Sequence, residues 1–335
     1  RLRDPTETHS LPLLKPERPM RALILAATLL ATTFPVAARD LLLVGNKGED
    51  SFGIYDLADG KQLAKLPTGS QPHEIAVMGD GTQAAVVNYG GTTIDVIDLD
   101  PLGKVATIEL APNRRPHGLL WMPRSERLIA TTEGSNSVAI VEPDGKVTSI
   151  ATGQQGSHMV ALLGEERAFV ANIGSGTVSV LDLKANTKLR DLTLGGKPEG
   201  IAVASGKVFV GDLTAPRLSV FDAATYEKLG ELAIDGNAIR VIASPDGRTV
   251  ATSNVNKGTV TLVDATTHSV LRSFVVSGDP QAAQVTLIWS SDGKRLYAAE
   301  TMRNQIAEID AGTGKVLRRI DVGKNGDGLA VTRVP

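Results

Sequence analysis

The stretch that decides the fold runs from Ser70 to Leu110 and reads SQPHEIAVMGDGTQAAVVNYGGTTIDVIDLDPLGKVATIEL. It contains four short apolar runs rich in Val, Ile, Ala and Leu, and turn residues such as Asp80-Gly81 and Gly90-Gly91 separate them. Runs of this length and composition, bounded by Gly and Asp, are typical of β-strands joined by tight turns. The stretch therefore predicts a small sheet of four strands.

The same pattern recurs, with variation, along the rest of the chain. In each unit an acidic residue follows an apolar strand, and successive markers are 40 to 46 residues apart. The seven markers are Asp56, Asp98, Glu142, Asp182, Asp222, Asp264 and Asp310. Four-stranded units repeated at this period are typical of a β-propeller, in which neighbouring units cover each other's faces. We therefore predict an all-β fold, a seven-bladed β-propeller with four antiparallel strands in each blade.

The two ends of the predicted propeller fit a closed ring. The chain from Asp40 onward resembles the second strand of a unit, whereas residues 326–331 resemble a first strand. The C-terminal strand would then complete the N-terminal blade, which leaves no open sheet edge. We expect residues 39–335 to form this one domain. About four extra residues between Asp279 and Trp289 predict a bulge or a longer loop in the seventh blade.

The N-terminal region has the pattern of a secretory signal. Met20 and Arg21 precede an apolar run at 22–34, and the small residues at 36–38 follow it. This order predicts a signal peptide at 20–38 and export to the periplasm. We expect residues 1–19 to be an upstream or disordered extension. The apolar run is too short for a spanning helix, and no later run reaches that length, so we expect no membrane span after signal removal.

The composition excludes several classes of function. The 335 residues include no cysteine, which excludes disulfides, Cys-ligated zinc, iron–sulfur clusters and thioether-attached haem. The formal net charge is −2 and only 4% of the residues are aromatic. Proteins that bind single strands need a cationic groove and stacking aromatic side chains, so nucleic acid is not an expected partner. The sequence also lacks the G-x-S-x-G, H-E-x-x-H and phosphate-loop motifs.

Three segments carry a resemblance to a known family. They are KPEGIAV at 197–203, VAN at 170–172 with GTVSVLD at 176–182, and SN at 253–254 with GTV at 258–260. These units are similar to those of the YVTN-type propeller family, over residues 40–335. The resemblance implies an exported seven-bladed propeller and no specific chemistry, because the repeated motif is a folding motif. Some YncE-like relatives are associated with single-stranded nucleic acid, which the composition of this chain does not favour.

One aligned position, just before the first strand of each unit, holds chemically versatile side chains. Because the first strand lines the central channel, these side chains should gather at one channel mouth. They are His73, His117, His158, Glu199 and Asp327, with Ile239 in the sixth blade and either Gln281 or Val285 in the seventh. Imidazoles and carboxylates are ligands that a divalent metal prefers, so His73, His117 and His158 are candidate metal ligands. The alternative is that this position faces solvent and accepts any polar residue.

A second aligned position, at the end of the second strand, is polar in every blade. It holds Asn46, Asn88, Thr132, Asn172, Asp212, Asn254 and Glu300. The second strand returns to the mouth that the first strand leaves, so we expect these side chains on the same face, farther from the axis. Asn88, Asn172 and Asp212 are therefore candidate ligand-binding residues, although Asn and Asp at such turns also cap backbone amides. Arg114 and Arg115, beside His117, could bind an anion at this face.

These features favour a binding or scaffold module that acts as a monomer through the channel mouth on a small ligand, a peptide or an envelope protein. One alternative is a metal-dependent lyase or lactonase-type hydrolase, with His117, His158 and Glu199 as ligands and a neighbouring histidine as base. Another is binding of a haem-type tetrapyrrole. Propeller nitrite reductases carry a haem between histidines of adjacent blades, and His73 with His117 or His158 resembles that arrangement. The sequence establishes no cofactor.

Overall fold

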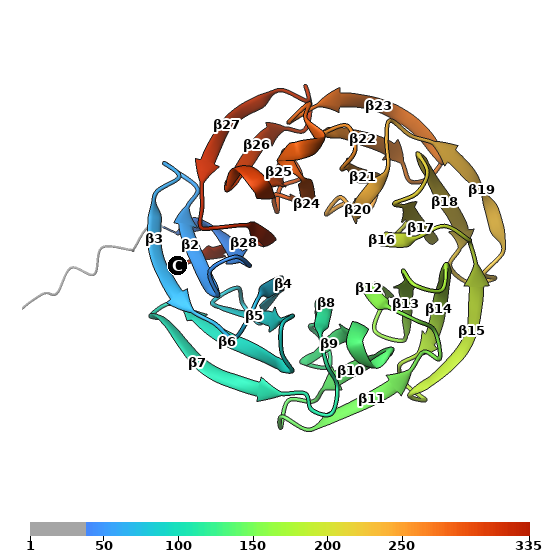
Figure 1. The fold of residues 1–335 in the computed structure, drawn as a ribbon, viewed down its shortest axis with the longest axis horizontal. Helices are drawn as coiled ribbons and strands as arrows, with labels where there is room; N and C mark the ends of the chain where they lie inside the picture. Colours follow the sequence, from blue (N-terminus) through green and yellow to red (C-terminus); the bar gives the residue numbers. More distant parts are fainter. Residues whose placement is uncertain (1–37) are drawn as a thin grey trace, which may run out of the picture. The chain divides into compact units, whose positions relative to one another are not determined.

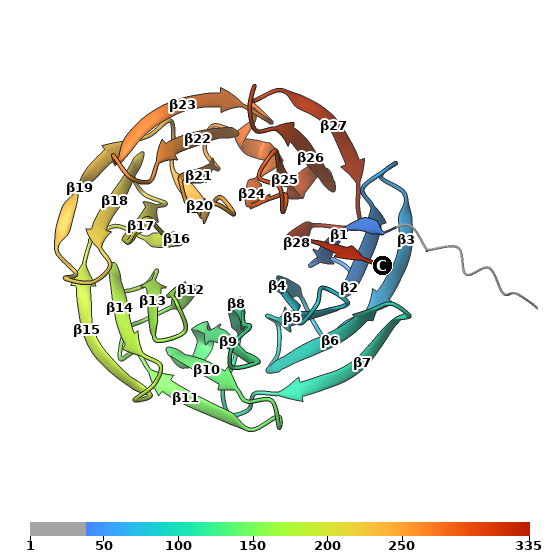
Figure 2. The ribbon, with the colours of Figure 1, turned by 180° about the vertical axis from the view of Figure 1, so that it is seen from behind.

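The computed structural model describes residues 38–335, and seven four-stranded antiparallel sheets surround a common axis (Figure 1). The predicted seven-bladed propeller is therefore confirmed. The same innermost strands surround the axis when the molecule is viewed from behind (Figure 2). The predicted extension at 1–19 and the predicted signal peptide at 20–38, apart from Ala38, lie outside the described residues. Within 38–335, no helix is long and apolar enough to cross a membrane.

Each blade contributes one strand to each of four concentric positions. The innermost strands are β28 (Gly326–Val334), β4 (Pro72–Met78), β8 (Pro116–Met122), β12 (Ser157–Leu163), β16 (Pro198–Ala204), β20 (Ala238–Ala243) and β24 (Gln284–Trp289). The second strands are β1 (Arg39–Asn46), β5 (Gln83–Asn88), β9 (Arg127–Thr132), β13 (Arg167–Asn172), β17 (Lys207–Asp212), β21 (Thr249–Asn254) and β25 (Arg295–Glu300). The third strands are β2 (Ser51–Asp56), β6 (Thr93–Leu99), β10 (Ser137–Val141), β14 (Thr177–Asp182), β18 (Arg217–Asp222), β22 (Thr259–Asp264) and β26 (Gln305–Asp310). The outermost strands are β3 (Gln62–Pro67), β7 (Leu102–Glu109), β11 (Val147–Ala151), β15 (Thr187–Thr193), β19 (Lys228–Ala233), β23 (Ser269–Val275) and β27 (Val316–Asp321). Three short 3-10 helices are η1 (Glu133–Ser135), η2 (Pro280–Ala282) and η3 (Thr301–Arg303).

The first blade combines the two ends of the described chain, as predicted. β28 pairs antiparallel with β1, and the register places Val331 opposite Leu42 and Leu329 opposite Val44. Leu42, Val44 and Leu329 are buried in one apolar cluster, and Val331 packs against it. The ring is thus closed by hydrogen bonds between residues that lie almost 300 positions apart in the sequence.

The periodic acidic residue has an architectural role in the turn after the third strand. The Asp182 carboxylate accepts hydrogen bonds from the backbone N–H groups of Lys184 (3.0 Å) and Ala185 (2.8 Å). Asp222 and Asp264 make the same pair of bonds in their own blades. A short acidic side chain at the first position of a turn satisfies amides that the sheet leaves unpaired. The repeat that reveals the fold is therefore a repeat of turn chemistry.

Every innermost strand begins with an irregularity in its pairing with the second strand. In β4, Pro72 lies opposite Asn88 and the regular register resumes only at Ile75. Such a bulge turns the residues between the two paired positions out of the sheet, and here it directs them toward the channel. In the seventh blade Gln284 lies opposite Glu300 in the same way, so Val285, and not Gln281, occupies the aligned position. The extra residues of this blade form η2 in a longer loop, as predicted.

Candidate functional site

The structure brings the three predicted histidines into one stack at the channel mouth. The ring centroids of His73 and His117 are 4.1 Å apart, and those of His117 and His158 are 3.6 Å apart. The three residues are only 4%, 3% and 8% exposed, respectively. We call them the imidazole stack. The alternative that this position faces solvent is contradicted, because the bulges on adjacent strands β4, β8 and β12 turn the side chains inward against one another.

His158 lies between two carboxylates. Its Nδ1 is 2.8 Å from Glu133 Oε2, and its Nε2 is 3.3 Å from Glu199 Oε1. Burial alone would lower the pKa of His158, but hydrogen bonding and attraction to these two carboxylates outweigh it and raise the pKa to about 9. His158 is therefore an imidazolium at neutral pH and donates both of its N–H groups.

His117 has the opposite electrostatic environment. Burial, with further contributions from the charges of His158 and Arg240, holds the pKa of His117 well below its usual value. Its Nδ1 is buried and has no hydrogen-bond partner among residues 38–335. His117 is thus a neutral imidazole with a nitrogen free to bind a ligand.

His73 completes the stack and connects it to the predicted carboxylate of the first blade. Its Nε2 is 3.3 Å from Asp327 Oδ2, and its Nδ1 is 3.4 Å from Glu74 Oε1. All five predicted residues of the aligned position therefore meet: Asp327 contacts His73, and Glu199 contacts His158.

A second buried layer, which the sequence did not predict as part of the site, lies one residue deeper along the inner strands. Arg240 of β20 forms an ion pair with Glu74 of β4 across the channel axis, and its Nη2 is 3.0 Å from Thr286 Oγ1. Its Nη1 is 3.1 Å from Met159 Sδ. Burial tends to raise the pKa of Glu74, but the charge of Arg240 outweighs it and lowers the pKa to about 2. The sequence did contain one indication of this layer: Arg240 is a charged residue inside the otherwise apolar run AIRVIA at 238–243.

Beyond this layer the channel has apolar walls. A cavity of about 460 Å³ is lined by inner-strand side chains such as Leu119, Val160 and Leu287, with Glu74 and Arg240 also in its wall. The ion pair therefore lies between the imidazole stack and this cavity.

The rim of the mouth also holds residues that the sequence analysis missed. The Tyr89 ring meets His73 and His117 edge-on, at centroid distances of 5.7 and 5.4 Å. Lys47 Nζ lies 5.0 Å from the Tyr89 ring centroid, and the Tyr89 hydroxyl donates to Glu133 at 3.1 Å. Lys47, Tyr89 and Glu133 each follow the polar position at the end of a second strand. An alignment extended by one residue would have placed them together.

The two predicted arginines lie beside this rim. The guanidinium of Arg115 stacks over the Tyr89 ring at 4.5 Å and contacts the Tyr89 hydroxyl. Arg114 and Arg115 both line a shallow depression of about 480 Å³ together with Gly90, Gly91 and Gly134. Arg115 is therefore in contact with the site, whereas Arg114 lies in the neighbouring depression.

The predicted polar residues at the ends of the second strands are buried, and their hydrogen bonds lie within their own blades and adjoining loops. Asn88 Nδ2 donates to Thr93 Oγ1 at 2.8 Å. Asn172 Nδ2 donates to Ser179 Oγ at 2.9 Å in the same manner. Asp212 accepts from Arg217 Nη2 at 2.8 Å and from the backbone N–H of Lys197 at 3.1 Å. These contacts join second strands to third strands and loops, and they do not involve the imidazole stack.

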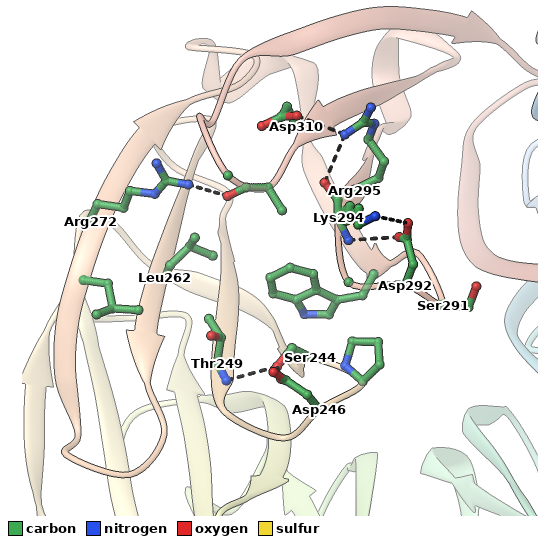
Figure 3. A pocket seen from close by; sticks show the side chains of 16 residues that line it. Ser244, Asp246, Thr249, Leu262, Arg272, Ser291, Asp292, Lys294, Arg295 and Asp310 are labelled. Carbon is green, nitrogen blue, oxygen red and sulfur yellow. Dashed lines mark hydrogen bonds and ion pairs between the residues drawn. The ribbon is translucent and has the colours of Figure 1, made fainter.

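A larger cavity of about 780 Å³ lies on the opposite face, between the sixth and seventh blades (Figure 3). Its charged side chains satisfy each other: Arg295 Nη1 is 2.9 Å from Asp310 Oδ2, and Lys294 Nζ is 3.9 Å from Asp292 Oδ2. Arg272 donates to the carbonyl of Ala311. None of the predicted site residues lines this cavity.

Comparison with known proteins places the chain among propellers of several functions. No family model matches the sequence. The chain is 23% identical over 272 residues to protein NirF of Stutzerimonas stutzeri, an alignment that covers 73% of this chain and 68% of NirF. The shared property is the fold. Hydrazine synthase of Kuenenia stuttgartiensis superposes with a TM-score of 0.70 at 17% identity, over 81% of this chain and 92% of that chain. The dihydro-heme d1 dehydrogenase NirN, in complex with DHE, superposes with a TM-score of 0.61 at 15% identity, over 87% of this chain and 74% of that chain. These superpositions show the propeller fold, and none of the comparisons shows the YVTN-type family.

Proposed function

We propose that this protein is a binding module that holds a small anionic ligand at the channel mouth, above the imidazole stack. The observation that carries the proposal is His117, a neutral buried imidazole whose Nδ1 has no partner within 38–335. It contacts Tyr89, whose ring also lies against the cations of Lys47 and Arg115. A ligand with one group that an imidazole can bind, and with carboxylates around it, matches this arrangement.

The charges at the mouth favour an anion. The buried carboxylates below the rim contact cations: Glu133 and Glu199 share the imidazolium of His158, and Glu74 contacts Arg240. Among residues 38–335, the Lys47 ammonium has one carboxylate partner, Asp327, at a distance of 3.9 Å. Arg115 is half exposed and lies 3.6 Å from Glu133. Both rim cations therefore have donor groups left for an incoming carboxylate, and a guanidinium can bind it in bidentate fashion.

We infer that the ligand is a tetrapyrrole of the haem type. Two points support this class: a similar propeller, NirN, is a dihydro-heme d1 dehydrogenase in complex with DHE, and the mouth combines a free imidazole nitrogen with rim cations. His117 would ligate the iron, while Arg115 and Lys47 would hold the carboxylates. When bound, such a group supplies redox or ligand-exchange chemistry at its metal. Export to the periplasm and a monomeric state, inferred from the sequence, belong to the same proposal.

The proposal is tested by titration of the purified protein with haemin and, in parallel, with metal-free protoporphyrin. We expect a saturable shift of the haemin absorbance at one equivalent, which His117→Ala abolishes. Arg115→Ala should weaken the binding of both compounds by about tenfold, which corresponds to one charge-assisted contact. Arg248→Ala is the matched control, because Arg248 is exposed and pairs only with Asp246. The absence of saturable binding of either compound, or an unchanged response in His117→Ala, would refute the proposal.

A further inference from the structure

We infer that His73, Glu74 and His117 form a site for one divalent transition metal ion. One ligand atom from each of the three residues lies within 4.8 Å of the other two, and all three residues are buried. His73 Nδ1 and Glu74 Oε1 are already 3.4 Å apart, which is the separation of two ligands in a tetrahedral site with bonds of about 2.1 Å. A ligand atom of His117 lies within 4.8 Å of ligand atoms of these two residues, so closing to metal-bond geometry requires only local side-chain adjustment. The inference goes beyond the proposed function, because it requires no tetrapyrrole; since both use His117, the metal ion and a tetrapyrrole iron would compete for this residue.

Each of the two histidines has a buried ring nitrogen that makes no hydrogen bond within residues 38–335. These nitrogens are His73 Nδ1 and His117 Nδ1. Buried polar atoms are nearly always paired, so two such nitrogens in adjacent stacked rings require an explanation. A metal ion between them would satisfy both.

The residues behind the three ligands are arranged as the outer partners of a metal site. Asp327 Oδ2 lies 3.3 Å from His73 Nε2, so this carboxylate fixes the ring with Nε2 protonated and Nδ1 free. Thr286 Oγ1 in turn donates to Asp327 Oδ1 at 3.0 Å. Arg240 Nη2 contacts Glu74 Oε1 itself, which leaves the second lone pair of this oxygen for the metal, and it also contacts the same threonine hydroxyl. A carboxylate–histidine–metal arrangement with an anchored carboxylate is typical of sites that are built for a metal.

The ligand types select the class of metal. Two imidazoles and one carboxylate favour Zn²⁺ and similar ions over Mg²⁺ and Ca²⁺, which prefer oxygen ligands. Three protein ligands leave one coordination position open, as in catalytic rather than structural zinc sites. His158 lies outside this set, because its Nδ1 is 2.8 Å from Glu133 Oε2 and the group whose ligand atoms lie within 4.8 Å of one another does not include it. The predicted set of three histidines is thereby revised to two histidines and Glu74.

The test is zinc binding to the chelator-stripped protein, measured by calorimetry and by metal analysis after dialysis, with Co²⁺ absorption as a probe of geometry. We expect one Zn²⁺ per chain and visible ligand-field bands with Co²⁺. His73→Ala and His117→Ala should each weaken Zn²⁺ binding at least tenfold, and Glu74→Gln should do the same. Glu231→Gln is the matched control, since Glu231 lies on the outermost strand β19 and pairs with Lys228 and Arg217, far from the three ligands. Circular dichroism of each variant verifies that the fold is retained.

The outcomes separate this inference from the proposed function. The His73→Ala variant should lose zinc binding but keep the haemin response. If the wild type does not bind haemin, the proposed function fails, but the zinc-binding measurement still tests the metal site. Absence of saturable zinc binding would overturn the inference. Binding that survives both histidine substitutions would place the ion at an adventitious surface site and would overturn it as well. Binding that Glu74→Gln preserves and His158→Ala removes would identify the three-histidine set instead and would likewise overturn it.

Discussion

His117 and His158 stack with their ring centroids 3.6 Å apart, and yet the two imidazoles have opposite protonation states at neutral pH. The difference arises from their neighbours. Glu133 and Glu199 surround His158, whereas His117 has imidazoles on both of its faces. The charge of His158 also suppresses protonation of His117. One residue of the pair is therefore held as a cation and the other as a free ligand.

The charged state of His158 should make the stability of the protein depend on pH. Its pKa is raised to about 9 in the folded protein, against about 6.5 in the unfolded chain. The contribution is therefore complete below pH 6.5 and is lost as the pH rises through 9. We expect the free energy of unfolding of the wild type, relative to His158→Gln, to fall by on the order of 1–3 kcal/mol between pH 6 and pH 9.5. Urea denaturation of both proteins at the two pH values measures this difference. If the difference in unfolding free energy between the wild type and His158→Gln is the same at both pH values, His158 is not charged in the folded state. The His268→Gln variant serves as the control.

The Glu74–Arg240 ion pair should matter most when only one partner is removed. Glu74→Ala leaves Arg240 buried without its carboxylate, which we expect to cost about 3–5 kcal/mol of stability. Replacement of both residues by methionine should recover most of this loss, because no charge then remains to be desolvated. A double-mutant cycle by chemical denaturation measures the coupling, and additive effects of the two substitutions would contradict it.

The Glu74–Arg240 ion pair should remain ionised and stabilising in mild acid. The pKa of Glu74 is lowered to about 2, so its contribution is present above pH 4.5 and is lost as the pH falls through 2. We expect the Glu74→Gln variant to be less stable than the wild type at pH 5, with a difference that narrows as the pH approaches 2. A difference that stays the same from pH 5 to pH 2 would argue against an ionised Glu74 in the fold. Thermal denaturation monitored by circular dichroism measures the stability of both proteins across this pH range.

Gly328 should be required for the position of His73. A Cβ at Gly328 would overlap the carbonyl group of His73, because β28 and β4 approach closely at the mouth. Since the overlap is with backbone, it cannot be relieved by a rotamer change. We expect Gly328→Ala to lower the melting temperature by several degrees and to weaken zinc binding at the same time. Gly103→Ala is the control, because a Cβ there meets no atom within 4 Å. Equal behaviour of the two variants would contradict the expected clash.

The blade number, the closure by β28 and the aligned channel position were all predictable from the sequence. The turn chemistry of residues such as Asp182 acts over only three residues, so it repeats wherever a blade repeats. The sequence left open which residue of the seventh blade occupies the aligned channel position, because η2 adds residues before β24. The pairing of Gln284 with Glu300 shows that this residue is Val285.

The sequence by itself determined which residues reach the channel mouth, because local strand and turn patterns set the register of each blade. Only the tertiary structure decided what those residues do there. Glu74 and Arg240 lie 166 positions apart and meet because the ring brings opposite blades together at its axis. The protonation of His117 and His158 likewise depends on burial and on carboxylates from other blades. Charge and desolvation are properties of the assembled mouth, and no single repeat contains them.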